Sequence, residues 1–168
     1  MITKKEVIDL MVMECEIAKH LFKKLPKSKM NYRPGTKMRS TIELLRYMSF
    51  CGTECARIIT LDSFKTNNWE KYEIAAKKSE KLKPGQFIKA MDAQIKDIKK
   101  LIGAIPEADL ARKKIKLPFG GTITLGQALL TVPFRFMSGY RMQLFLYAKA
   151  SNKKIGTSNC WFGIDAKM

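Results

Sequence analysis

The chain has 168 residues, of which 46% are hydrophobic and 28% are charged. This length fits one domain, which we expect to cover residues 1–168, and the composition is typical of a globular protein with one sizeable core. No apolar run approaches the roughly 20 residues that cross a bilayer, so the sequence excludes a membrane-spanning protein. The N-terminal lysines are followed by closely spaced acidic residues rather than by a signal peptide, and we expect a cytoplasmic protein.

The formal net charge of +17 is the most unusual bulk property and favours anionic partners. Most of this charge is lysine spread along every segment, whereas nucleic-acid-binding proteins more often cluster arginine with exposed aromatic residues. We therefore expect at most weak, salt-sensitive nucleic-acid binding. No acidic residue occurs between Asp109 and Asp165, and this segment predicts a positive face. Its basic residues are Arg112, Lys113, Lys114, Lys116, Arg135, Arg141, Lys149, Lys153 and Lys154.

Two capping boxes predict where the first two helices begin. In this motif the side chain of a serine or threonine accepts from a free backbone amide, while a glutamate three residues later reaches back to another amide. Thr3 with Glu6 predicts a first helix that ends before Pro26. Ser40 with Glu43 predicts a second helix, and apolar residues recur at spacings of three and four along both.

The stretch over residues 61–83 is polar and has two asparagines at 67–68 that favour a turn. We predict a loop here with one short helix around Glu70 to Ser79. Trp69 and Tyr72 are large enough to fold this loop back onto the rest of the molecule.

Pro84 suits the first position of a third helix, and its apolar stripe ends where Gly103 and Pro106 stop it. The next stretch alternates apolar and polar residues around a proline and two glycines. It predicts a small β-hairpin over residues 114–124, with the glycines at 120–121 serving the turn rather than a phosphate site.

Thr124 with Gln127 caps a long fourth helix, in which Pro133 removes one backbone donor and predicts a kink or an irregular turn. The tail beyond this helix shows no periodicity. Trp161 and Phe162 are too apolar to lie free in water, so they either pack on the bundle or help to form a dimer contact. We predict a homodimer.

Four amphipathic helices with long connections on both sides of the third predict a four-helix bundle, in which inward-facing side chains build cofactor sites. The stretch NYRPGTKMRSTIELLRYM (31–48) resembles the segment that leads into the second helix of the DinB-like, or YfiT-like, family. The stretch SGYRMQLFLYAKASN (138–152) resembles the fourth helix of that family, and the hairpin between helices also fits. The resemblance implies a mainly α, DinB-like four-helix bundle with a small β-hairpin between helices 3 and 4.

In the family that the chain resembles, one histidine on the second helix and a histidine-x-x-x-histidine pair on the fourth hold a divalent metal. Carried over position by position, these ligands correspond to Tyr47, Phe136 and Tyr140. Phenylalanine has no donor atom and a neutral phenol is a poor ligand, so we expect neither a bound metal nor another cofactor. Arg141 and Gln143 match the residues that follow the second histidine in the family. This match indicates that the fourth helix keeps the family's register although the ligands are replaced.

These aromatic side chains have two interpretations: they fill the former metal cavity as core, or they line a ligand pocket with phenol hydroxyls as its polar groups. The candidate pocket consists of Tyr47, Cys51, Phe136 and Tyr140. Cys51 and Cys55 share one helix face and could point into this cavity. Two thiols are too few to bind zinc, which needs further ligands. We therefore interpret both cysteines as small buried residues of the core. The four cysteines are expected as reduced thiols, and His20, the only histidine, at the edge of an apolar stripe.

The sequence therefore predicts a DinB-like bundle with a degenerate, metal-free site, which acts as a non-catalytic or weakly catalytic module that binds a small ligand or a protein. The main alternative is a metal-dependent or thiol-dependent transferase or hydrolase of the DinB-like type, which the family resemblance implies. A second alternative, binding of nucleic acid or another polyanion, depends on charge alone.

Overall fold

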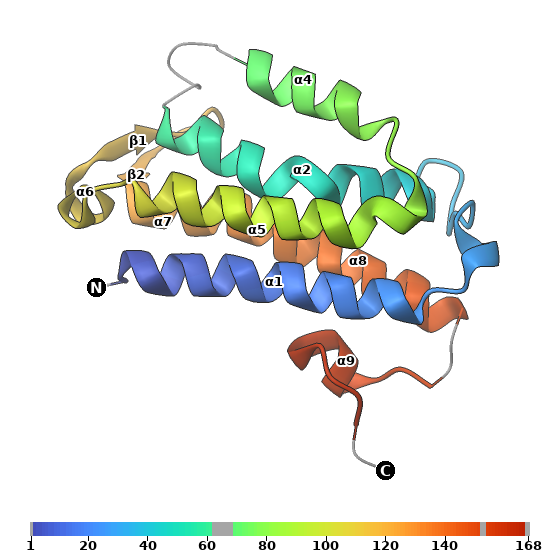
Figure 1. The fold of residues 1–168 in the computed structure, drawn as a ribbon. Helices are drawn as coiled ribbons and strands as arrows, with labels where there is room; N and C mark the ends of the chain where they lie inside the picture. Colours follow the sequence, from blue (N-terminus) through green and yellow to red (C-terminus); the bar gives the residue numbers. More distant parts are fainter. Residues whose placement is uncertain (1, 62–68, 152–153, 167–168) are drawn as a thin grey trace.

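The computed structural model describes residues 2–61, 69–151 and 154–166 (Figure 1). Four long helical segments form the bundle, and their buried apolar side chains form one core cluster. These segments are α1 (Lys4–Lys24), α2 (Thr41–Thr60), α5 (Phe87–Gly103) and a fourth made of α7 (Leu125–Leu129), η3 (Leu130–Phe134) and α8 (Arg135–Ser151). Both α1 and α2 pack against α5 and against α8. The predicted mainly α four-helix bundle is confirmed.

The predicted capping boxes at Thr3, Ser40 and Thr124 are all formed. At α1, the backbone amide of Thr3 donates to Glu6 Oε2 over 2.7 Å, and the amide of Glu6 donates to Thr3 Oγ1 over 3.2 Å. Such bonds satisfy amides that the first turn of a helix leaves without an intrahelical partner. Local sequence therefore sets where three of the four segments begin.

The direction of the helices explains why the second connection is long. Figure 1 shows α2 and α5 running in the same direction, opposite to α1 and α8. The chain must therefore return along the bundle between α2 and α5, and α4 (Glu70–Ser79) is part of this return, packed on the outside of α2. The short helix predicted at these residues is confirmed, whereas the turn predicted at 67–68 lies outside the described residues.

The connection between α5 and α7 passes through α6 (Glu107–Arg112) and a hairpin of β1 (Lys114–Lys116) and β2 (Thr122–Thr124). Gly120 and Gly121 form its turn with φ values of 96° and 86°, a backbone region that glycine adopts without strain. The predicted hairpin is confirmed. The sequence did not predict α6, because six residues are too few to show a helical period.

Two prolines mark irregular helical turns. Pro84 opens a 3₁₀ turn, η2 (Pro84–Gln86), and the α-helix begins only after it; a similar 3₁₀ turn, η1 (Lys27–Lys29), follows α1. Pro133 lies within η3, which is a π-helical turn between α7 and α8. Because proline has no backbone N–H, it interrupts the regular ladder, and the irregular turn predicted near Pro133 is confirmed.

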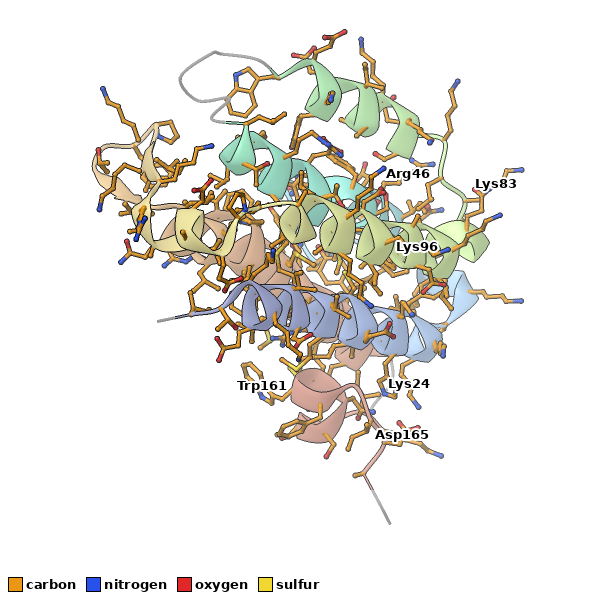
Figure 2. All side chains as sticks on the ribbon, turned by 60° about the vertical axis from the view of Figure 1, so that its left-hand side comes forward. Lys24, Arg46, Lys83, Lys96, Trp161 and Asp165 are labelled. Carbon is orange, nitrogen blue, oxygen red and sulfur yellow. The ribbon has the colours of Figure 1, made fainter. Side chains whose placement is uncertain are left out.

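The C-terminal tail contains α9 (Thr157–Phe162), which the sequence did not predict and which packs against α1 and α8. Figure 2 shows Trp161 beside α1, and Asp165 close to Lys24, whose Nζ lies 2.6 Å from Oδ1. Trp161 and Phe162 still remain 49% and 68% exposed. The tail therefore packs on the bundle but leaves an apolar surface. None of the helices in the described part of the chain combines the length and the apolar character that a bilayer crossing requires.

Candidate functional site

The three positions that the resemblance assigns to metal ligands lie next to one another, where α2 meets α8. The ring centroid of Tyr47 is 4.7 Å from that of Tyr140, and the centroid of Phe136 is 6.5 Å from that of Tyr140. These are the distances of packed aromatic pairs. Phe136 remains 41% exposed, so one edge of this aromatic cluster (Tyr47, Phe136 and Tyr140) faces solvent.

Arg39, which directly precedes the cap of α2, covers the aromatic cluster. Its Cζ lies 4.4 Å from the ring centroid of Tyr47 and 5.4 Å from that of Tyr140, within the range of cation–π contacts. Its carbonyl accepts from the hydroxyl of Tyr147 over 2.7 Å, and Gln143 donates to the same hydroxyl over 2.6 Å. No sequence signal indicated this role, because an arginine in a basic loop has no diagnostic spacing.

The hydroxyl of Tyr47 is used to attach α4 to α2. It is hydrogen-bonded to the hydroxyl of Tyr72 on α4, and the ring of Tyr72 packs 5.4 Å from that of Phe50. Burial, helped by two nearby cysteines, raises the pKa of Tyr47 far above its usual value, so this phenol stays protonated. The prediction that Tyr72 folds back onto the bundle is confirmed, while Trp69 is half-buried just before α4.

All four cysteines are free thiols and all are buried. Burial raises the pKa of Cys15 and Cys55 to about 12 and that of Cys51 well above its ordinary value. Because the thiolate is the nucleophilic and metal-binding form, these three thiols are unreactive at neutral pH. Cys51 lines a void of about 10 Å³ together with Glu14 and Gln94, which do not belong to the aromatic cluster.

Gln94 is a buried polar residue that links α5 to α2. Its Oε1 accepts from the backbone amides of Gly52 over 2.9 Å and Thr53 over 3.2 Å, and its Nε2 donates to the carbonyl of Met48 over 2.9 Å. In a regular α-helix the amide of Gly52 donates to the carbonyl of Met48. The side chain of Gln94 therefore bonds to both members of one backbone hydrogen-bond pair of α2. The sequence did contain a signal for this burial, because Gln94 lies three residues after Met91 and therefore on the apolar face of the helix.

A buried ion pair joins α1 to α8. Arg141 Nε lies 2.8 Å from Glu14 Oε2, and the two side chains are 2% and 4% exposed. Burial alone lowers the pKa of Arg141, but its bonds to Glu14 and the charge of that carboxylate raise it overall. Arg141 also donates to Cys160 Sγ over 3.4 Å and lies 4.8 Å above the ring of Trp161 on α9. The prediction that Arg141 contributes to a positive face is therefore wrong.

His20 lies at the edge of the apolar stripe of α1, as expected. Its Nε2 is 3.0 Å from Asn159 Nδ2 on α9 and 3.6 Å from an oxygen of Asp165. Burial lowers the pKa of His20, although the charge of Asp165 acts in the opposite direction. The partners of His20 belong to the tail, so this histidine helps to dock α9 and does not contribute to the aromatic cluster.

The side chains at the former ligand positions do not fit a divalent metal. Phe136 has no donor atom, and the protonated phenol of Tyr47 is already bonded to Tyr72. Within residues 2–61, 69–151 and 154–166, no three side chains of histidine, cysteine, aspartate or glutamate come together as a ligand set. Three neutral imidazoles would be needed at this place to build the catalytic type of site, which keeps an open coordination position.

A comparison with solved structures finds the crystal structure of a DinB-like protein, YjoA, from Bacillus subtilis. The superposition has a TM-score of 0.64 at 16% sequence identity, and it covers 86% of this chain and 91% of that one. No protein-family model matches the sequence, and none of the curated proteins matches it. At this identity the likeness establishes the fold alone. The chain has the DinB-like fold that the motifs before its second helix and within its fourth helix predicted.

Proposed function

We propose that this protein is a DinB-like bundle that works without a metal, as a non-catalytic or weakly catalytic module that binds a small ligand or a protein. The observation that carries the proposal is the contact between Tyr47, Phe136 and Tyr140, which pack against one another beneath Arg39. Aromatic rings and a guanidinium occupy the place in which imidazoles would hold an ion. This arrangement stabilises the contact between α2 and α8 without supplying a Lewis acid.

A metal-dependent or thiol-dependent transferase or hydrolase is less well supported. A metal-activated nucleophile requires several donor atoms at one place, and Tyr47 with Phe136 supplies no suitable pair. A nucleophilic cysteine requires a lowered pKa or an adjacent base, whereas burial raises the pKa of Cys51 and Cys55.

Restoring the imidazoles tests the proposal. The triple variant Tyr47→His/Phe136→His/Tyr140→His should bind about one Zn²⁺ or Ni²⁺ per chain in calorimetric titrations, because three adjacent imidazoles suit these ions. The wild-type protein should show no saturable binding under the same conditions. The variant Tyr47→Phe/Tyr140→Phe is the control, because it removes the phenols without adding ligands. Saturable binding by the wild-type protein, whatever the variants do, would contradict the proposal.

We also propose a homodimer, because α9 and the residues after it leave Trp161, Phe162 and Ile164 between 49% and 68% exposed. Two chains of charge +17 repel each other, but at about 0.15 M salt the Debye length falls to about 8 Å. Dimerisation should therefore strengthen as salt rises, and Phe162→Ser should weaken it. Sedimentation velocity at several ionic strengths measures this, and a monomer at every salt concentration would contradict the proposal.

A further inference from the structure

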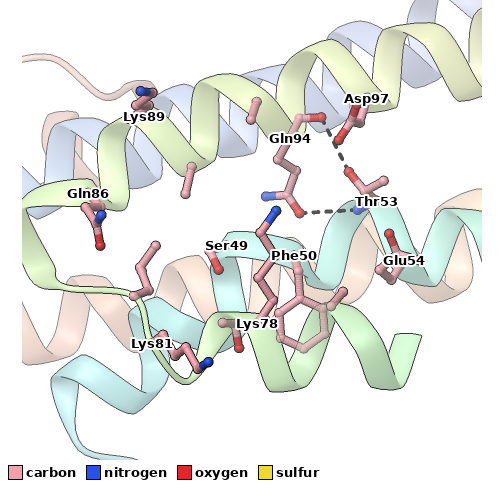
Figure 3. Close-up of a pocket in the computed structure, with 15 residues that line it drawn as sticks. Ser49, Phe50, Thr53, Glu54, Lys78, Lys81, Gln86, Lys89, Gln94 and Asp97 are labelled. Atoms are coloured by element: carbon pink, nitrogen blue, oxygen red, sulfur yellow. Dashed lines mark hydrogen bonds between the residues drawn. The ribbon is translucent and has the colours of Figure 1, made fainter. Parts of the chain in front are cut away.

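A groove lies between α2, α4 and α5, and no sequence pattern predicted it (Figure 3). Its volume is about 590 Å³, within the range of roughly 300–1,000 Å³ that is typical of small-molecule sites. Ala75 of α4 and Ala90 and Ala93 of α5 line it, and their short side chains leave this space open. The groove is separate from the aromatic cluster, whose residues do not line it.

Three lysines line the groove from three different segments. Lys78 belongs to α4, Lys81 to the connection after it, and Lys89 to α5. Their ammonium groups have no ion-pair or hydrogen-bond partner within the part of the chain that the structure describes. Figure 3 shows Lys78 extending from α4 into the space between α4 and α5. Lys81 and Lys89 lie on opposite sides of the groove (Figure 3), so the three unpaired cations surround it and together favour an anionic ligand.

The acidic lining residues lie toward the other end of the groove (Figure 3). Lys89 and Asp97 are eight residues apart on α5, which corresponds to about 12 Å along a helix. Glu54 is paired with Arg57, whose Nε lies 3.0 Å from Oε2, so its charge is partly neutralised. An anionic group is therefore attracted to the lysine end and repelled from Asp97, which gives a bound ligand a preferred orientation.

The surface between the two ends combines apolar side chains with the polar groups of Ser49, Thr53 and Gln94, and it is firmly held (Figure 3). Phe50 of α2 and Leu82 of the connection contribute apolar surface. Beneath them, Gln94 Oε1 accepts from the amide of Thr53 over 3.2 Å, and Thr53 Oγ1 donates to the carbonyl of Gln94 over 3.4 Å. These bonds fix α2 relative to α5, so a ligand would find this surface already formed and lose less entropy on binding.

The outer wall of the groove depends on the aromatic residues of α2. Tyr72 attaches α4 through its contact with Phe50 and its hydrogen bond with Tyr47. The side chain at a position that the resemblance assigns to a metal ligand therefore helps to hold a wall of the groove instead.

We propose that this groove binds a small organic anion with an apolar body, such as an aryl or alkyl carboxylate or sulfonate. The anionic group contacts Lys78, whose side chain extends into the groove, while Lys81 and Lys89 add positive charge at its edges. The apolar body lies on Phe50 and Leu82. The inference rests on the proposed binding function and deepens it, because it names a site and a ligand class.

The fluorescent sulfonate 8-anilinonaphthalene-1-sulfonate is a suitable probe, because it combines both parts of this ligand class. We expect it to bind the wild-type protein at one saturable site by calorimetry and fluorescence. Lys78→Gln/Lys89→Gln should weaken binding at least about tenfold, since one charge-assisted contact and one nearby positive charge are lost. The matched variant Lys77→Gln/Lys96→Gln changes the net charge equally on the same two helices but outside the groove lining, and should stay within about twofold.

Ala93→Trp fills the groove without changing charge and should abolish binding, with circular dichroism to show that the helices remain. Equal weakening by both lysine pairs, or unchanged binding by Ala93→Trp, would overturn the assignment of the site. The titration does not depend on metal. If the dye does not bind in the groove, the proposal that the protein works without a metal still stands. Conversely, a metal found in the protein would not change the result of the dye titration.

Discussion

We expect the substitution Arg141→Met to lower the free energy of unfolding by about 3–5 kcal/mol, because it leaves a buried carboxylate without its counter-charge. The carboxylate of Glu14 is 4% exposed and accepts from Arg141 Nε and Nη2 at 2.8 and 3.4 Å. Arg141 also holds Cys160 and Trp161 of α9, so its loss should loosen the tail as well. Urea denaturation followed by circular dichroism measures the change.

The double variant Glu14→Met/Arg141→Met is the matched control for this prediction. Replacing both partners of a buried ion pair by apolar residues of similar size is often close to neutral, so the double variant should be more stable than either single variant. Equal unfolding midpoints for Arg141→Met and the wild-type protein would show that the ion pair of Glu14 and Arg141 is not buried as described.

The second large effect is expected at Gly52. A Cβ at this position would lie 2.6 Å from Met137 Sδ, closer than a Cβ contact can be, and 3.0 Å from Gln94 Oε1, so both of these buried side chains would have to shift. Gly52→Ala should therefore lower the free energy of unfolding by about 1–3 kcal/mol through overpacking, although alanine is intrinsically the better helix former. It should also displace Gln94 from the backbone of α2.

Gly139, in the second turn of α8, supplies the opposite control. A Cβ there would have no neighbour within 4 Å, so Gly139→Ala should gain the helix propensity of alanine, about 1 kcal/mol, without any clash. Thermal or urea denaturation of the two variants should therefore give changes of opposite sign. A Gly52→Ala variant as stable as Gly139→Ala would contradict the close packing of α2, α5 and α8 around Gln94.

Most of the helical frame was predictable because its signals are local. The boxes at Thr3, Ser40 and Thr124 act within one turn of the chain, and so do the hairpin glycines. The two short helices α6 and α9 were missed, since they form through contacts with the bundle rather than through a period of their own. The irregular turn at Pro133 was predictable, but not that it would be π-helical.

The candidate site was predictable only in part. The adjacency of Tyr47, Phe136 and Tyr140 followed from the family resemblance, which aligns positions on two helices distant in sequence. Arg39 was not predictable, because its place depends on a hydrogen bond from the hydroxyl of Tyr147, on α8, to its backbone carbonyl. The groove also escaped prediction, since it is formed by three helices whose relative placement no single stretch of sequence encodes.

Polar residues on apolar stripes are a further signal of contacts between helices. Glu14 follows Met11 by three residues on the first helix, and Gln94 follows Met91 in the same way on the third. Both are buried and hydrogen-bonded, as buried polar groups must be. A polar side chain at such a position needs a partner on a neighbouring helix, so the amino-acid pattern alone can indicate where two helices meet.

The most direct test of metal-independent function is the metal content of the protein purified without chelators, measured by inductively coupled plasma mass spectrometry. We predict far less than one zinc, nickel or other transition-metal ion per folded chain, because Tyr47, Phe136 and Tyr140 cannot replace three imidazoles. About one zinc or nickel ion per chain, lost on substitution of Cys51 or Cys55, would contradict the account, because it would show that the buried thiols hold a metal.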